Sequence, residues 1–379
     1  MKLAEYKNQI YSCLRCGFCF DHEVGSQAKI CPSHASYGME SYGARGKLAI
    51  ARALVDEAME FDQDVAERIY TCTECGACEE QCFKYLDLLD IYRAMKSELV
   101  LRDLVPSPLA EAARAALEEG NPYGQAAGKR LDWAPGRERV GKQAETVLFV
   151  GCTPSYLRRG IARGAYQLLE AGDVEFGLLA DEVCCGHPSY VAGDLEGARA
   201  AVRKNVEAIE RADARRVVFA CPGCLATFRD EAPELLGRPL AFETLHVAEL
   251  VEQRLGAGLK LRKQSRMVTY HDPCNLGRGL GIYDAPRRVV DAVPGARRLE
   301  MRRTRARSFC CGNGGFVRLG YEPMAVENET ARLEESMATG ADLLLSACPA
   351  CQIAFLDAKR RSKAAIEVLD IVEWLAQAV

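Results

Sequence analysis

The sequence predicts an α/β protein: a helical N-terminal domain followed by two tandem, related α/β domains with mainly parallel sheets. Three observations support this prediction. The eighteen cysteines fall into four spaced groups, two of one pattern and then two of another. Helical spacing of apolar residues dominates the N-terminal quarter, whereas short apolar runs typical of buried parallel strands dominate the C-terminal half. That C-terminal half also repeats its own cysteine pattern.

Bulk composition excludes several classes of protein. The chain has 379 residues and a formal net charge of −4, which gives no general attraction to nucleic acid or to an anionic membrane surface. Residues 1–10 lack the apolar core of a signal peptide, and no apolar run is long enough to span a bilayer. We therefore expect a cytoplasmic protein, or one held at a membrane by a partner. In a reducing compartment, cysteines serve as ligands or redox groups more often than as disulfides.

The chain divides into four segments. We expect a helical domain, a connector rich in proline and glycine, and two α/β domains, with bounds at 1–101, 102–145, 146–258 and 259–379. Apolar spacing predicts helices at 44–60, 64–70, 87–101 and, within the connector, 109–119. The connector is expected to lie across the surface.

An internal duplication predicts the two α/β domains. Each copy carries a single cysteine, then a Cys-Cys-Gly triplet, then a C-x2-C pair. The matched residues are Cys152, Cys184, Cys185, Cys221 and Cys224 in the first copy and Cys274, Cys310, Cys311, Cys348 and Cys351 in the second. Short apolar runs precede several of these cysteines, at 147–150, 217–220, 268–270 and 343–347. The cysteines are therefore expected at the carboxyl ends of parallel strands, where open α/β sheets bind ligands.

The N-terminal segment carries the pattern C-x2-C-x2-C twice, each time with a more distant fourth cysteine. Three thiolates at this spacing can hold part of a cubane iron–sulfur cluster, and in two-cluster ferredoxins the fourth cysteine ligates the other cluster. This rule predicts two [4Fe–4S] clusters in a helical ferredoxin-like domain. Their ligands would be Cys13, Cys16, Cys19 and Cys82 for one cluster, and Cys72, Cys75, Cys78 and Cys31 for the other.

Details of these groups favour clusters over zinc. Gly17 and Gly76 follow the second cysteine of each group, where a missing side chain leaves room for the inorganic core. Pro32 follows Cys31 as the ferredoxin signature requires, although Phe83 stands after Cys82 where proline is expected. Zinc sites usually pair two C-x2-C units a dozen or more residues apart, so a third cysteine exceeds the needs of one tetrahedral ion.

Each copy of the second pattern offers five thiolates, one more than a cubane uses. Adjacent cysteines do not easily bind one small tetrahedral ion, but they can reach different irons of a larger cluster. Five sulfurs on one cluster leave room for a bridging thiolate and an irregular iron geometry. An iron with distorted coordination can also bind a substrate sulfur.

With these motifs, the chain resembles a heterodisulfide reductase-type iron–sulfur protein, of the kind in which a ferredoxin-like part is fused to two Cys-Cys-Gly domains. The resemblance covers nearly the whole chain except the connector. It rests on residues 13–19, 44–47, 183–186, 220–224, 270–274, 309–312 and 347–351. It implies two cubane clusters and two noncubane [4Fe–4S] clusters held by the Cys-Cys-Gly domains. Asn275 departs from similar proteins, in which histidine often follows this cysteine.

The resemblance also implies a function. Some similar proteins cleave a disulfide between two thiol coenzymes at the Cys-Cys-Gly clusters. Others are electron-relay subunits of glycolate, lactate or glycerol-3-phosphate dehydrogenases, which pass electrons towards quinone. We expect an oxidoreductase subunit that carries electrons from a flavoprotein or iron–sulfur partner to the noncubane clusters, for disulfide reduction or onward transfer. Because no flavin or nicotinamide site is evident, it is expected to act only with partner subunits. The sequence assigns no catalytic residue.

Smaller features have ordinary explanations beside functional ones. The pair Cys221 and Cys224 has thioredoxin-like spacing, but its recurrence beside a vicinal pair favours cluster ligation. For His187 and His271 we expect a polar loop residue and a strand end, with cluster hydrogen bonding as the alternative. Six arginines at 297–307 are expected to form a solvated edge, with binding of an anionic substrate or an acidic partner as the alternative. The glycines at 277–281 lack the helix context of a dinucleotide loop.

Overall fold

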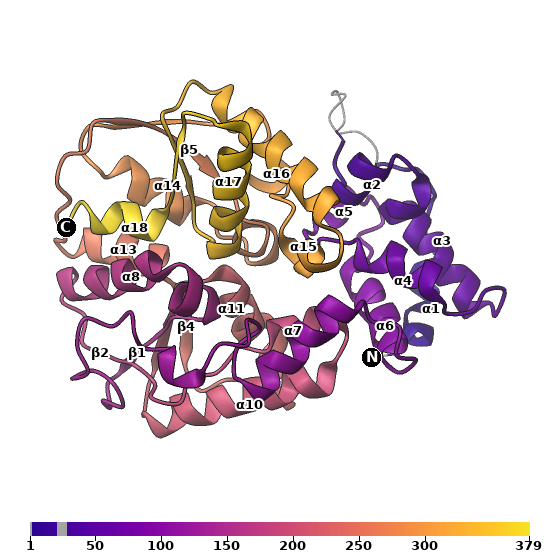
Figure 1. Cartoon of the computed structure of the whole chain (residues 1–379), viewed down its shortest axis with the longest axis horizontal. Helices are drawn as coiled ribbons and strands as arrows, with labels where there is room; N and C mark the ends of the chain where they lie inside the picture. Colours follow the sequence, from indigo (N-terminus) through magenta and orange to yellow (C-terminus); the bar gives the residue numbers. More distant parts are fainter. Residues whose placement is uncertain (1, 21–28) are drawn as a thin grey trace.

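The structure is a computed structural model that describes residues 2–20 and 29–379. Figure 1 shows a helical N-terminal part in indigo beside two α/β lobes, the first repeat below and the second above. The predicted fold class is confirmed, since each lobe contains a four-stranded parallel sheet. No helix among the described residues combines the length and the apolar character needed to cross a membrane.

The N-terminal part is built from short helices around an apolar core that includes Ala51, Ile69 and Ile91. Two of its predicted helices are found to within one residue at each end, whereas the one predicted at 44–60 ends at Val55. Glu57 adopts a φ of +57°, a left-handed conformation that a helix does not continue through. The elements are η1 (Leu3–Tyr6), α1 (Lys7–Tyr11), α2 (Pro32–Tyr37), η2 (Glu40–Tyr42), α3 (Ala44–Val55), α4 (Gln63–Tyr70), α5 (Ala77–Glu80) and α6 (Leu88–Val100).

The connector contains the helix α7 (Ser107–Glu118) close to the predicted 109–119, followed by η3 (Ala127–Lys129). The expectation that it lies across the surface is wrong for part of its length. Asn121, Arg130 and Trp133 are buried, because this stretch folds back onto the first repeat. The connector therefore contributes side chains to the interior of the first lobe.

In the first repeat the strand order is β2-β1-β3-β4, and every neighbouring pair is parallel. Because the strands are buried on both faces, they read as continuous apolar runs. The elements are β1 (Thr146–Phe149), the π-helix η4 (Thr153–Leu157), α8 (Arg159–Ala171), β2 (Phe176–Gly177), α9 (His187–Ala192), α10 (Leu195–Arg211), β3 (Arg216–Phe219), α11 (Pro222–Ala226), the π-helix η5 (Thr227–Glu231), α12 (Ala232–Leu236), β4 (Glu243–His246) and α13 (Val247–Gly256).

The second repeat has the equivalent strand order, β6-β5-β7-β8, again parallel throughout. The elements are β5 (Arg266–His271), the π-helix η6 (Asn275–Gly279), α14 (Asp284–Asp291), β6 (Ala296–Leu299), η7 (Arg305–Arg307), η8 (Gly314–Phe316), α15 (Val317–Gly320), α16 (Glu322–Met337), β7 (Leu343–Ser346), α17 (Pro349–Ser362), β8 (Glu367–Asp370) and α18 (Ile371–Ala376).

The two repeats pack reciprocally. The last helix of each repeat lies on the first long helix of the other, α13 on α14 and α18 on α8 (Figure 1). Arg158 reinforces this junction, since its Nε donates to Oε1 of Gln352 at 2.8 Å. The pairing turns the carboxyl ends of both sheets toward one another, and this arrangement positions the cysteines described next.

Candidate metal centres

The first cubane site predicted from the sequence corresponds to one cavity. Its lining includes Cys13, Cys16 and Cys19 from the first loop together with Cys82, which follows α5. Cys16 is exposed, and the other three are partly buried. The fourth cysteine of the second run thus meets the first three of the first run, as cross-ligation requires.

The second cubane site corresponds to a neighbouring cavity lined by Cys72, Cys75, Cys78 and Cys31. Its thiols lie deeper than those of the first site, and Cys75 and Cys78 are buried. Burial raises the pKa of Cys72 to about 11 and that of Cys19 in the first cavity to about 12. Such thiols ionise readily only with a cation nearby, which is the situation a metal cluster creates.

The short segment at the start of α3 supplies one cation to each cavity. Arg45 lines the first cavity and donates from Nη1 to the Arg15 carbonyl at 2.9 Å. Lys47, only 1% exposed, lines the second and donates from Nζ to Ser33 Oγ at 3.3 Å. Between them, Gly46 admits no larger residue, since a Cβ there would lie 2.1 Å from the Glu40 carbonyl oxygen.

Gly17 and Gly76 have a backbone reason to be glycine as well as the predicted steric one. Their φ angles are +85° and +69°, in the left-handed region that disfavours a side chain. Each lets the loop reverse directly after the second cysteine of its group. The exception at Phe83 is tolerated because this ring is 61% exposed and outside the core.

In the first repeat, the five cysteines form a continuous chain of thiol contacts. Cys152 is hydrogen-bonded to Cys184, Cys184 to Cys185, Cys185 to Cys224, and Cys224 to Cys221. The hydrogen bonds from Cys184 and Cys224 lower the pKa of Cys185 to about 6. At neutral pH the second residue of the vicinal pair is therefore set up as a thiolate, the form that binds metal.

The second repeat reproduces this chain in the same order. Cys274 is hydrogen-bonded to Cys310, Cys310 to Cys311, Cys311 to Cys351, and Cys351 to Cys348. The hydrogen bond from Cys310 lowers the pKa of Cys311 well below its usual value. Two sites of five converging sulfurs therefore lie at the carboxyl ends of the two sheets, a donor set suited to an iron–sulfur cluster larger than one ion.

The two five-cysteine sites face a common cleft of about 280 Å³. Nine of their ten cysteines line it, Cys310 being the exception. Cys221 and Cys348 interact electrostatically across the cleft. Apolar side chains complete its wall, among them Tyr123, Leu157 and Phe316.

The two histidines near the cysteines lie closer to the sites than expected. His271 closes β5 as predicted, but its ring nitrogen, Cys311 Sγ and Cys351 Sγ all lie within 4.8 Å of one another. His187 is the first residue of α9 rather than a loop residue, because Gly186, with φ of +95°, lets the chain turn directly into the helix. Its ring lines the cleft. Pairwise sequence spacing gives no signal for either contact.

The arginines at 297–307 form an ion-paired layer rather than the solvated edge we expected. Arg303 is paired with Glu335 at 2.7 Å, and its side chain is only 14% exposed. Arg298 is paired with Asp291 at 2.7 Å. Because α14 and α16 carry the opposing carboxylates, these cations bind their own lobe.

A larger cavity of about 650 Å³ lies between the N-terminal part and the two repeats. Its wall is rich in carboxylates, including Glu79, Glu231 and Glu234, and His187 lines both this cavity and the cleft. Burial raises the pKa of Glu79 to about 7 and raises that of Glu231. The acidic wall makes this cavity a poor site for an anion.

Comparison with known protein families defines the class of the chain. Residues 9–86 match the 4Fe-4S dicluster domain, and residues 146–229 and 268–356 match the cysteine-rich domain. The fold resembles that of a hypothetical protein from Helicobacter pylori, with a TM-score of 0.56 and 12% identity over 89% of this chain and 67% of that one. The protein is therefore an iron–sulfur protein with one dicluster domain and two cysteine-rich domains.

Similarity to curated proteins then gives the family. The chain is 32% identical to the D-type polypeptide of the dihydromethanophenazine:CoB–CoM heterodisulfide reductase of Methanosarcina barkeri, over 98% of this chain and 94% of that protein. It belongs to this family of heterodisulfide reductase polypeptides and is an iron–sulfur oxidoreductase. It is also 28% identical to the B-type polypeptide of the fumarate reductase (CoM/CoB) of Methanothermobacter marburgensis, over 85% of this chain and 64% of that protein. Identity to the EtfAB:quinone oxidoreductase of Syntrophomonas wolfei is 27%, over 86% and 48%.

Proposed function

We propose that this chain receives electrons from a flavoprotein or iron–sulfur partner and uses them to reduce a disulfide in the cleft between its two repeats. Two [4Fe–4S] cubane clusters and two noncubane [4Fe–4S] clusters would supply one-electron storage and an iron that can bind sulfur. The proposed cubane ligands are Cys13, Cys16, Cys19 and Cys82, and Cys72, Cys75, Cys78 and Cys31. The proposed noncubane ligands are Cys152, Cys184, Cys185, Cys221 and Cys224, and Cys274, Cys310, Cys311, Cys348 and Cys351.

The observation that carries this proposal is the shared cleft. A disulfide has two sulfur atoms, and the cleft presents one five-cysteine site on each side. Reduction adds two electrons and two protons to the S–S bond and yields two thiols. Apolar residues such as Leu157 and Phe316 exclude water from the cleft wall, and a largely apolar cleft favours an uncharged disulfide over a charged donor. The name of the Methanosarcina relative, a CoB–CoM heterodisulfide reductase, supports this substrate class.

The surface around the first cubane site supports entry of electrons from a partner there. Cys16 is the exposed cysteine of the chain. Leu14 and Phe83 line the same cavity and are 64% and 61% exposed, and Phe83 meets Phe18 edge-on with ring centroids 5.1 Å apart. An exposed apolar patch beside a redox site is typical of a protein-docking surface. The partner itself would bring the flavin or further clusters.

The competing function is an electron relay without bond chemistry, which similarity to the EtfAB:quinone oxidoreductase of Syntrophomonas wolfei favours. Electron paramagnetic resonance of partly oxidised, cluster-loaded protein separates the two. We expect a new paramagnetic signal when thiols such as coenzyme M are added. The alcohol that differs from each thiol only at the sulfur atom is the control and should produce none. Loaded protein that responds to no thiol would support the relay and contradict disulfide reduction.

A further inference from the structure

One cysteine of the second repeat turns away from the cleft. Cys310 does not line the cleft, although its counterpart in the first repeat, Cys184, does. Instead Cys310 is hydrogen-bonded to Cys75, a proposed ligand of the second cubane site. The two side chains are 2% and 8% exposed and pack together with Ala77. The second cubane site and the second five-cysteine site are therefore in direct contact.

Arg278 fastens this contact. It lies in η6, directly after Cys274, and its Nε donates to the carbonyl of Cys75. Its Nη1 donates to the carbonyls of Ala306 at 3.1 Å and Ser308 at 2.6 Å. The guanidinium thus joins the N-terminal part to the loop that precedes Cys310.

The charge of Arg278 is directed at sulfur. The thiols of Cys75, Cys274 and Cys310 are the main groups that interact favourably with its guanidinium. Its Nη2 is buried and has no hydrogen-bond partner. Among the described residues, no carboxylate forms an ion pair with it, so this buried charge is balanced by the thiolates alone.

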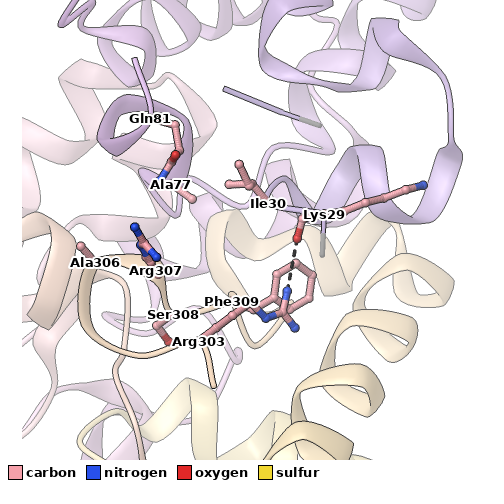
Figure 2. Close-up of a pocket in the computed structure, with 9 residues that line it drawn as sticks. All are labelled: Lys29, Ile30, Ala77, Gln81, Arg303, Ala306, Arg307, Ser308 and Phe309. Atoms are coloured by element: carbon pink, nitrogen blue, oxygen red, sulfur yellow. Dashed lines mark hydrogen bonds between the residues drawn. The ribbon is translucent and has the colours of Figure 1, made fainter. Parts of the chain in front are cut away.

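Contacts beside Arg278 keep the junction closed. Figure 2 shows Arg303 reaching from the second repeat to the backbone of Lys29, and its Nη1 donates to that carbonyl at 3.2 Å. The same guanidinium lies 4.2 Å from the centre of the Phe309 ring, one residue before Cys310. Ala77 and Gln81 of the N-terminal part lie on the other side of this small pocket. The loop at 303–309 is therefore held against the dicluster domain.

The first repeat lacks this arrangement. The residue equivalent to Arg278, by the offset between Cys152 and Cys274, is Tyr156. An arginine from the connector, Arg130, approaches Cys152 there, with Nη2 3.3 Å from Sγ. Arg130 is also paired with Glu182 at 2.7 Å, so a carboxylate offsets its charge.

We propose that Arg278 is a positioning residue that couples the second cubane site to the second five-cysteine site, making the latter the point where electrons enter the cleft. This inference rests on the proposed function, because it assumes that both sites hold clusters. One electron would pass from the reduced second cubane to the adjoining site, with no bond formed or broken. A buried cation stabilises the more negative, reduced form of a nearby cluster, so Arg278 raises the potential there.

The test is a potentiometric titration of cluster-loaded, full-length protein followed by electron paramagnetic resonance. The signal of the second cubane is identified as the one that Cys78→Ser removes. We expect Arg278→Gln to lower the equilibrium constant for one-electron reduction of this cubane at least tenfold, a shift of about 59 mV. Arg278→Lys keeps the charge and should restore the constant to within about threefold. Arg288→Gln, an exposed change on the same lobe, is the matched control and should have no effect.

An unchanged potential in a loaded Arg278→Gln protein would overturn the inference while leaving the proposed function intact. Should that variant lose iron, Arg278→Lys decides. Lysine does not replace three fixed donor bonds, so freeze-quenched samples should show at least tenfold slower electron arrival at the second five-cysteine site at unchanged potential. Arrival at the normal rate would overturn the coupling role. Wild-type protein that holds no iron would instead contradict the proposed function.

Discussion

The ring of His271 is held between Arg332 and Cys311. Nε of Arg332 donates to Nδ1 of the imidazole at 3.1 Å. Burial lowers the pKa of His271, so the ring is neutral and its proton lies on Nε2, free for the hydrogen bond with Cys311. By the offset between the repeats, the equivalent residue in the first copy is Phe149, which has no donor. The two five-cysteine sites are therefore electronically different.

Replacing His271 with phenylalanine should make the sites more alike. Hydrogen bonds to cluster sulfurs raise reduction potentials, so His271→Phe should lower the potential of the second noncubane site by tens of millivolts, on the order of 1 kcal/mol. Potentiometric titration with magnetic resonance detection measures this shift. His271→Gln retains a donor and is the control. Equal potentials in wild type and His271→Phe would show that the hydrogen bond has no electronic role.

Cross-ligation of the cubanes can be tested by combining serine substitutions. Cys16→Ser and Cys82→Ser remove ligands from one cavity, so the double variant should lose no more iron than either single one, about four atoms. Cys82→Ser combined with Cys78→Ser removes ligands from both cavities and should lose about eight. Iron analysis of anaerobically purified protein gives the counts. Additive losses in the first pair would contradict the assignment of Cys82.

The junction of the dicluster domain with the first repeat depends on Gly193. Its φ is +93°, and a Cβ there would lie 2.5 Å from the carbonyl carbon of Lys96 in α6. Gly193→Ala should therefore destabilise the protein by at least about 3 kcal/mol, from backbone strain and overpacking together. At Gly237, with φ of +66° and no atom within 4 Å, alanine should cost about 1 kcal/mol. Urea unfolding compares the two, and equal losses would contradict the packing argument.

One buried histidine makes stability depend on pH. Burial, with the nearby Arg229 charge, lowers the pKa of His246 to about 3, whereas an unfolded histidine titrates near about 6.5. Its stabilising effect is therefore complete above about pH 6.5 and falls as the pH drops toward 3, by at most about 1.4 kcal/mol per unit. His246→Asn keeps an acceptor for the Ala248 N–H but does not titrate.

Unfolding free energies at pH 7.5 and 5.5 test this dependence. The difference between wild type and His246→Asn should shift by about 1 kcal/mol in favour of the variant at the lower pH. A difference that stays constant across this range would mean that His246 is protonated in the folded protein.

Local sequence patterns predicted the strands, most helices and the grouping of cysteines, because spacing along the chain encodes them. The runs that end at Phe149 and Ser346 are buried parallel strands, with cysteines following as expected. Contacts made between distant segments had no such signal. Arg278 lies 203 residues from Cys75, and the buried Arg130 lies in a stretch expected at the surface. Such pairings arise from the reciprocal packing of the repeats and from docking of the N-terminal part.

The central claim is that this chain holds four iron–sulfur clusters, two on each cysteine pattern. Iron and acid-labile sulfide in anaerobically purified, full-length protein measure this directly. The account predicts about sixteen irons and a comparable amount of sulfide per chain, with almost no titratable thiol. About eight irons with ten free thiols, or zinc in place of iron, would contradict it.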